Sequence, residues 1–203
     1  MGQGYFSLRV DPKAGEWKHE IGLRMAYLMG FGFVLNLIDT YLLPRTSLGF
    51  LIHFGLIVAW FALPEMLLRR SSRVGVVTFA TCFIALISVY LIETNLPTPG
   101  LTSAQLLLVS LGGALGFSAG YGARNLLATV LGLMFGPAIG FLTGLLLKVI
   151  PVELEDSFWV FVICVLLPCA AFSLSIGLAV WLGVKLSRRG QPNPPGAQQP
   201  ASV

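Results

Sequence analysis

The sequence has few charged residues. Of its 203 residues only 11% are charged, whereas 56% are hydrophobic. A typical soluble domain has about 25% charged residues, so this chain has too little polar surface to cover a globule in water. The composition therefore excludes a soluble enzyme, a disordered regulator and a nucleic-acid-binding domain, and it indicates a polytopic membrane protein.

Residues for metal, redox or hydrolytic chemistry are also scarce. The chain has two histidines, His19 and His53, and three cysteines, Cys82, Cys164 and Cys169, which lie in apolar runs without a CxxC motif. There is no Walker A motif, no HExxH motif and no haem-ligating histidine pair, and neither a zinc site nor a disulfide is expected. We predict no cofactor, no metal site, no catalytic residue and no enzymatic activity.

What the chain does contain is six apolar runs, each long enough to cross about 30 Å of hydrocarbon as a helix. They lie at residues 22–43, 48–68, 74–92, 102–121, 126–148 and 157–186. The weakest break separates the fourth and fifth runs, which leaves open five spans with a long or re-entrant fourth element. Pro168 in the long last run predicts a tilt or kink. We expect an all-α membrane helix bundle with a segment 1–20, a six-helix domain 21–189 and a disordered tail 190–203.

The placement of lysine and arginine predicts the orientation of the bundle. With six spans, every basic residue except Arg45 and Lys148 falls on the same side of the membrane. Because cytoplasmic loops carry the excess of basic residues, we expect both termini in the cytoplasm and the protein in a bacterial inner (plasma) membrane. The expected partners are the lipid bilayer and either further copies of the chain or other membrane subunits, with no nucleic acid.

Glycine recurs at every fourth position of the fourth and fifth expected spans. The series are Gly112, Gly116 and Gly120 in the fourth, and Gly132, Gly136, Gly140 and Gly144 in the fifth. Glycines at this spacing share one face of a helix, where the absent side chains let another backbone approach closely. The short link at 121–125 predicts an antiparallel hairpin. The glycine faces either pack on each other or face another subunit, a pore or a sliding surface.

Ionisable residues lie inside the first two expected spans, where charge is costly and usually faces a partner or a cavity. If these spans form a hairpin, Arg24 and Glu65 fall at the same depth near the inner face and form a candidate ion pair. Asp39 and His53 fall at the same depth near the outer face, and Asn36 lies one turn from Asp39. These three form a candidate intramembrane polar site for a proton or cation. The alternative is that the two pairs, Arg24 with Glu65 and Asp39 with His53, are structural and only hold the hairpin together.

Two short motifs resemble those of known families. The segment Gly116 to Gly120 matches GxSxG and is similar to the GxSG serine motif of rhomboid intramembrane proteases, but its second glycine is one residue late. No histidine follows Ser118 to act as its base. The segment Gly132 to Gly144 resembles the FGPxxGxxxG stretch of the substrate-binding components of energy-coupling-factor vitamin transporters, where it lies in an early span. This resemblance implies uptake of a small solute and assigns no ligand or binding residue.

Two classes of function remain after these exclusions. One is a transporter- or channel-type protein, or membrane subunit, that handles a small solute or ion. The alternative is a non-catalytic accessory or assembly subunit of a larger membrane complex, docking through its glycine-rich helix faces.

Overall fold

A computed structural model describes residues 16–42, 47–95, 102–149 and 158–189. Within the helices, the side chains at 35–36, 39–42, 47–51, 53–54, 158–165 and 189 are outside the description. The described residues form helices and no strands, as the composition predicts. They are a short π-helix, η1 (Lys18–Leu23), followed by α1 (Arg24–Leu42), α2 (Ser47–Arg69), α3 (Ser72–Asn95), α4 (Ser103–Gly122), α5 (Leu126–Leu147) and α6 (Phe158–Arg189).

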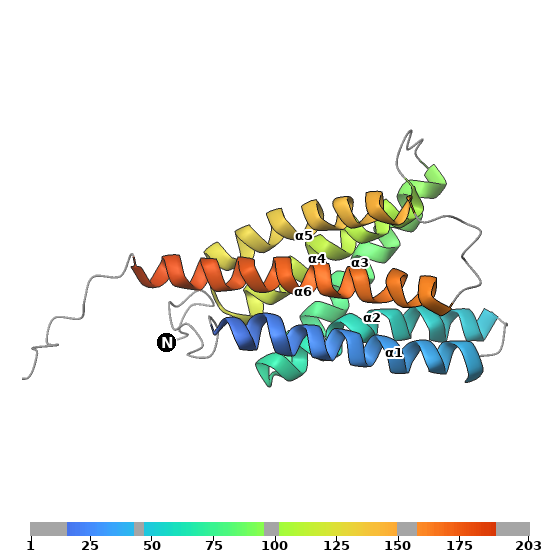
Figure 1. Ribbon diagram of the computed structural model, residues 1–203, viewed down its shortest axis with the longest axis horizontal. Helices are drawn as coiled ribbons and strands as arrows, with labels where there is room; N and C mark the ends of the chain where they lie inside the picture. The colour runs from blue at the N-terminus through green and yellow to red at the C-terminus, as the bar shows by residue number, and fades with distance from the viewer. Residues whose placement is uncertain (1–15, 43–46, 96–101, 150–157, 190–203) are drawn as a thin grey trace, which may run out of the picture.

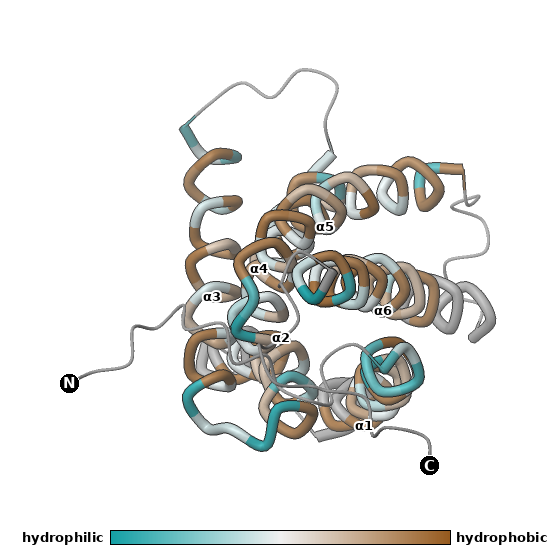
Figure 2. Tube along the Cα trace, turned by 90° about the vertical axis from the view of Figure 1, so that its left-hand side faces the viewer, coloured by the Kyte–Doolittle hydropathy of each residue, from teal (hydrophilic) through white to brown (hydrophobic). Residues whose placement is uncertain are grey.

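The helices run alternately up and down, so that η1 and the end of α6 lie at the same end of the bundle (Figure 1). Each helix packs against the next in sequence, and α6 returns to contact η1 and α1. The central helix is α4, which contacts α2, α3, α5 and α6 (Figure 2). The most extensive contact in the molecule joins α4 and α5.

Helix boundaries differ from the expected spans mainly at the beginning of the chain. Helical structure begins at Lys18, before the expected start at 22, and α3 continues to Asn95. The fourth and fifth elements are two separate full-length helices, as six spans require. Helix α6 continues through Pro168 as one helix.

Four helices in the described part of the chain are long and apolar enough to cross a membrane. They are α3, α4, α5 and the part Leu166–Arg188 of α6. Large apolar side chains on these helices point outward, such as Val76 at 67% exposed and Met134 at 62%. Water would penalise this surface, whereas lipid chains are a good solvent for it. That α1 and α2 also cross the membrane, and that both termini lie in the cytoplasm, remain predictions.

Backbone contact between glycines joins α4 to α5. A Cβ atom added at Gly116 would overlap the carbonyl group of Gly132, and one added at Gly136 would overlap the carbonyl group of Gly112. Conversely, a Cβ added at Gly132 would overlap the carbonyl group of Gly116, and one added at Gly112 would overlap that of Gly136. These two helices therefore approach as closely as their main chains allow, and small residues make this possible.

The other glycines of the two series are also occupied within the chain. A Cβ at Gly140 would overlap the carbonyl group of Leu108, and one at Gly120 would overlap the backbone of Thr129. At Gly144 it would lie 2.6 Å from Cγ of Gln105. All seven glycines thus face the partner helix of the hairpin, rather than another subunit or a pore.

A tight turn at residues 123–125 closes this hairpin. Asn125 caps α5, because its side chain accepts a hydrogen bond from the backbone N–H of Ala128 at 2.8 Å. At the other end, Thr102 and Gln105 form a capping box at the start of α4. Both caps satisfy backbone groups that the first turn of a helix leaves without partners.

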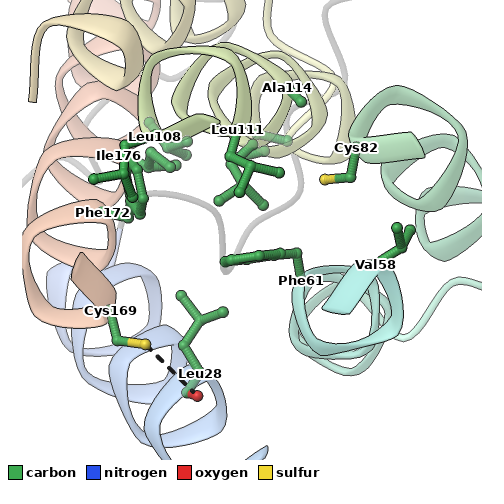
Figure 3. Close-up of a cluster of buried hydrophobic side chains, with 14 of the residues drawn as sticks. Leu28, Val58, Phe61, Cys82, Leu108, Leu111, Ala114, Cys169, Phe172 and Ile176 are labelled. Atoms are coloured by element: carbon green, nitrogen blue, oxygen red, sulfur yellow. Dashed lines mark hydrogen bonds between the residues drawn. The ribbon is translucent and has the colours of Figure 1, made fainter. Parts of the chain in front are cut away.

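The core lies where α1, α2, α4 and α6 meet. Leu28, Phe61, Leu111 and Phe172 fill it with apolar side chains from the four helices (Figure 3). The carbonyl oxygen of Leu28 also accepts hydrogen bonds from Nε1 of Trp60 at 2.6 Å and from Sγ of Cys169 at 3.9 Å. This carbonyl therefore links α1 to both α2 and α6.

Candidate functional site: a buried charge cluster

Two segments with the pattern Glu-x-x-x-Arg face each other across η1–α1 and α2. One is Glu20 to Arg24, where η1 passes into α1, and the other is Glu65 to Arg69, at the end of α2. Residues four apart lie on the same side of a helix. Because α1 and α2 are antiparallel, the glutamate of each segment comes opposite the arginine of the other. We call these four residues the charge cluster.

Arg69 and Glu20 form the better-defined of the two cross-pairs. Nη1 of Arg69 donates to Oε1 of Glu20 at 2.6 Å, and Nη2 donates to Oε2 at 2.7 Å. Two parallel bonds between a guanidinium and a carboxylate fix direction as well as distance. This pair joins η1 directly to the end of α2.

Arg24 binds both glutamates. Its Nε pairs with Oε1 of Glu65, and its Nη2 lies 3.2 Å from Oε2 of Glu65 and 3.3 Å from Oε2 of Glu20. Nη1 of Arg24 also donates to the backbone carbonyl of Glu20. The guanidinium thus connects the two pairs into one network.

The network is almost completely buried. The exposed fractions are 0% for Glu20, 1% for Arg24, 2% for Glu65 and 9% for Arg69. Two carboxylates and two guanidiniums sum to zero charge, so each buried ion has a counter-ion in contact. Removing one member would leave an uncompensated charge, and in proteins this costs far more than the net value of the pair.

The helices around the charge cluster are unusual at the points that hold it. Glu20 lies in the π-helical segment. This type of helix is rare in proteins, and where it occurs it is often part of a functional site. Pro64 precedes Glu65 and removes the helix hydrogen bond to the carbonyl of Trp60. On the third side, Gly177 of α6 lets η1 approach, since a Cβ there would lie 2.9 Å from the carbonyl oxygen of Glu20.

Two nitrogen atoms at the margin of the cluster are buried and have no hydrogen-bond partner among the described residues. They are Nε of Arg69 and Nδ1 of His19. The histidine nitrogen lies 3.9 Å from Oε1 of Glu20, beyond hydrogen-bond distance. Buried polar atoms are normally paired, so these are the positions at which the cluster can take a further hydrogen bond.

The sequence predicts part of this site. It places Arg24 opposite Glu65, and the structure brings those two together. It treats residues 1–20 as a segment outside the helical domain and so misses Glu20. The signal that could have found Glu20 is the repeated Glu-x-x-x-Arg pattern. In a buried helical hairpin, a glutamate and an arginine on one helix need an arginine and a glutamate on the other.

The other predicted site lies outside the described side chains. Asn36, Asp39 and His53 belong to α1 and α2, but the positions of their side chains are not described. Their role as a polar site for a proton or cation remains a prediction. Among the described residues, no group of three histidine, cysteine or acidic side chains is placed to hold a metal ion.

Ser118, the serine of the GxSxG match, is buried in α4. Its hydroxyl donates to the carbonyl of Ala114 at 2.7 Å and lies 3.0 Å from the hydroxyl of Thr81 on α3. The nucleophile elbow of hydrolases needs a strand before the serine, whereas helix precedes and follows this serine. Its contacts tie α3 to α4.

Comparison of the chain with protein-family models, with curated proteins and with solved structures found no match. What can be said of function therefore comes from the chain itself. Its apolar, outward-facing helices make it a helical integral membrane protein, with a neutral cluster of four charged residues buried at one end of the bundle.

Proposed function

We propose that this protein is of the transporter or channel type, or is the membrane subunit of such a system, and that it handles a small solute or ion. The observation that carries the proposal is the buried charge cluster between η1–α1 and α2. Charged residues inside a membrane domain are expensive, and they typically mark substrate or ion pathways.

Arg24 gives the cluster two ways of pairing. Because its guanidinium contacts both Glu20 and Glu65, it can exchange one carboxylate for the other without losing its counter-ion. Pro64 leaves α2 one hydrogen bond short next to Glu65. A hairpin held in this way can adopt two discrete arrangements, as alternating access requires.

The hairpin α1–α2 is also where the sequence predicts the outer polar site. Asn36, Asp39 and His53 lie in the half of this hairpin away from the charge cluster. We infer that the solute or ion is handled at this outer site and that the cluster closes the opposite end, which is predicted to be cytoplasmic. Ser118 has no part in this scheme, and we propose no enzymatic step.

The test is electrical. The full chain is reconstituted into liposomes on a solid-supported membrane, and charge movement is recorded on addition of H⁺, Na⁺, K⁺ and a panel of small organic solutes. We expect a solute-dependent current in the wild type that Asp39→Asn and His53→Ala abolish at an equal amount of folded protein. Ser88→Ala is the matched control, because Ser88 bonds only to its own helix on the outer surface of α3.

Each part of the proposal has its own contradicting result. A wild type with no solute-dependent current would contradict transport, and a current that survives both substitutions would mean that the solute is not handled at Asp39 and His53. Variants that fail to accumulate would mean that the two residues are structural. Loss of the current in Ser88→Ala would mean that the assay reports general damage.

The second candidate is a non-catalytic accessory or assembly subunit. It is favoured by the short connections, residues 70–71 between α2 and α3 and residues 123–125 between α4 and α5, which leave little mass outside the bilayer there. The glycine faces of α4 and α5 do not support it, because they are occupied within the chain. Native-gel migration after mild detergent extraction separates the candidates: an accessory subunit should run with partners, and a lone monomer would contradict that function.

A further inference from the structure

Two arginines occupy backbone positions that favour glycine. Arg70 has φ 48° and Arg124 has φ 52°, and they are the only residues other than glycine with positive φ in the described ranges. They lie in the α2–α3 and α4–α5 turns, respectively. A side chain in this left-handed conformation is strained where glycine is not. The conformation itself closes each helix, because the N–H of Ser71 bonds to the carbonyl of Met66 at 3.1 Å and that of Asn125 to the carbonyl of Gly120 at 3.2 Å. Glycine usually fills such a position, so an arginine at both turns points to a use for its side chain.

The two turns are neighbours. A Cβ added at Gly122, just before the α4–α5 turn, would lie 3.0 Å from Cγ of Arg69 and 3.1 Å from Cγ1 of Val74, on either side of the α2–α3 turn. On its other side, Asn125 donates from Nδ2 to the hydroxyl of Ser187 near the end of α6, at 2.9 Å. The ends of α2, α4 and α6 therefore form one continuous surface, which faces the viewer in Figure 2.

Exposed side chains make this surface basic. We call it the basic end, and it consists of Lys18, Arg70, Arg73, Arg124 and Lys185. The nearby acids Glu20 and Glu65 do not offset its charge, because they are buried and already paired with Arg24 and Arg69. Glu16 is the one exposed acid at this end among the described residues.

Apolar side chains on the membrane-facing surface lie next to these cations. Exposed Leu67 precedes Arg70 by one turn of α2, exposed Val76 follows Arg73 by one turn of α3, and exposed Leu126 follows Arg124 at the start of α5. A ligand that fits this arrangement has a phosphate at the level of the turns and acyl chains along the helices. A soluble acidic protein would gain nothing from the apolar half.

We propose that the basic end binds an anionic phospholipid, with Arg70 and Arg124 holding its headgroup phosphate. A guanidinium binds phosphate oxygens through two parallel hydrogen bonds, which lysine cannot do. Basic surfaces between membrane helices on the cytoplasmic side commonly hold anionic headgroups. The strain at both turns is then the cost of placing an arginine at the headgroup.

The test measures lipid preference and stability on the same variants. The full chain is reconstituted in vesicles of phosphatidylcholine with about one fifth phosphatidylglycerol, extracted in mild detergent, and the lipids that remain bound are counted by native mass spectrometry. Arg70→Gly/Arg124→Gly relieves both positive φ angles and so should unfold no more easily than the wild type. We expect it to lose the preference for phosphatidylglycerol, on the order of fivefold for each arginine removed.

Two further variants test whether the guanidinium groups, rather than positive charge in general, give the preference for phosphatidylglycerol. Arg70→Lys/Arg124→Lys should retain part of the preference, and Lys148→Gln, at the opposite end of α5, should retain all of it. The proposal is overturned if the double glycine variant keeps the wild-type preference, if Lys148→Gln loses as much, or if inorganic phosphate alone displaces the bound lipid. A double glycine variant that keeps its lipids but loses a co-purifying protein would show that the surface serves a protein partner instead.

Discussion

The two hairpins of this molecule are held together by opposite means. In α4–α5, glycines bring the two backbones into direct contact, and no charge is involved. In η1–α1 and α2, side chains make the connection: four buried charges at one end, and the bond from Trp60 to the carbonyl of Leu28 further along. The short turn at residues 123–125 holds the first contact in register, whereas the second can be rearranged by exchanging partners.

This difference indicates which part of the bundle is fixed and which part can move. A packed backbone interface tolerates no insertion of atoms, because nothing in it can give way. Ion pairs have discrete alternatives, provided that every charge stays paired. We therefore regard α4–α5 as the frame of the molecule and α1–α2 as its adjustable part.

The largest expected effect comes from adding a side chain between α4 and α5. Gly116→Leu or Gly136→Leu must separate the two backbones, so we expect a loss of more than about 3 kcal/mol of stability and little accumulated protein. Protein level and the unfolding of the extracted chain in rising SDS, followed by circular dichroism, measure this. Gly113→Ala is the control: its Cβ would lie 3.5 Å from Cγ of Pro137, an ordinary contact, and should be tolerated. If Gly116→Leu were tolerated as well, the helices would not be in backbone contact.

The next largest effect comes from unbalancing the charge cluster. Either Arg24→Met or Glu65→Met leaves a net charge in the buried network, at a cost of roughly 3–5 kcal/mol. The double variant restores neutrality, because Glu20 and Arg69 still pair. It should therefore unfold later in SDS than either single variant. If the two losses simply add, the cluster is not a closed network of charge.

A moderate effect is expected where one hydrogen bond ties α2 to α1. Trp60→Phe keeps an aromatic ring next to Phe61 but removes the donor to the carbonyl of Leu28 and the indole atoms that lie against Gly32. The lost hydrogen bond and the lost packing together should cost roughly 1–2 kcal/mol, read from the same SDS titration. A loss near that of the unbalanced cluster would mean that this bond, rather than the charges, holds the hairpin.

The smallest effect concerns Ser118. Ser118→Ala removes the hydroxyl contact with Thr81, and such bonds between membrane helices are worth about 0.6 kcal/mol on average. We expect a slight shift in the unfolding midpoint and no change in the transport current. Loss of the current at full stability would give Ser118 a chemical role that its contacts do not suggest.

The fold is largely readable from the sequence because it depends on local patterns. Apolar runs predict the helices, and glycines such as Gly116 and Gly132 predict which faces another backbone can approach, since their spacing matches the helix period. That the two faces meet each other, rather than another subunit or a pore, comes from the structure. The charge cluster is only half readable. Arg24 and Glu65 can be matched by depth in the hairpin, but Glu20 lies before the apolar run begins, in a π-helical turn that no periodicity reveals. The close approach of α6 to η1 at Gly177 is a contact between residues far apart in the sequence. Gly177 belongs to no series of regularly spaced glycines that could predict it.

The repeated Glu-x-x-x-Arg pattern also bears on how the chain enters the membrane. Each segment carries its own counter-charge one helical turn away, so each is electrically neutral before it meets the other. Arg69 is made 49 residues after Glu20, and during that interval Arg24 can shield the carboxylate alone. When the hairpin forms, the charged residues exchange ionic partners, and none of the four is left unpaired. If α1 and α2 cross the membrane as the sequence predicts, they are thereby suited to insertion before the frame, α4–α5, has been synthesised.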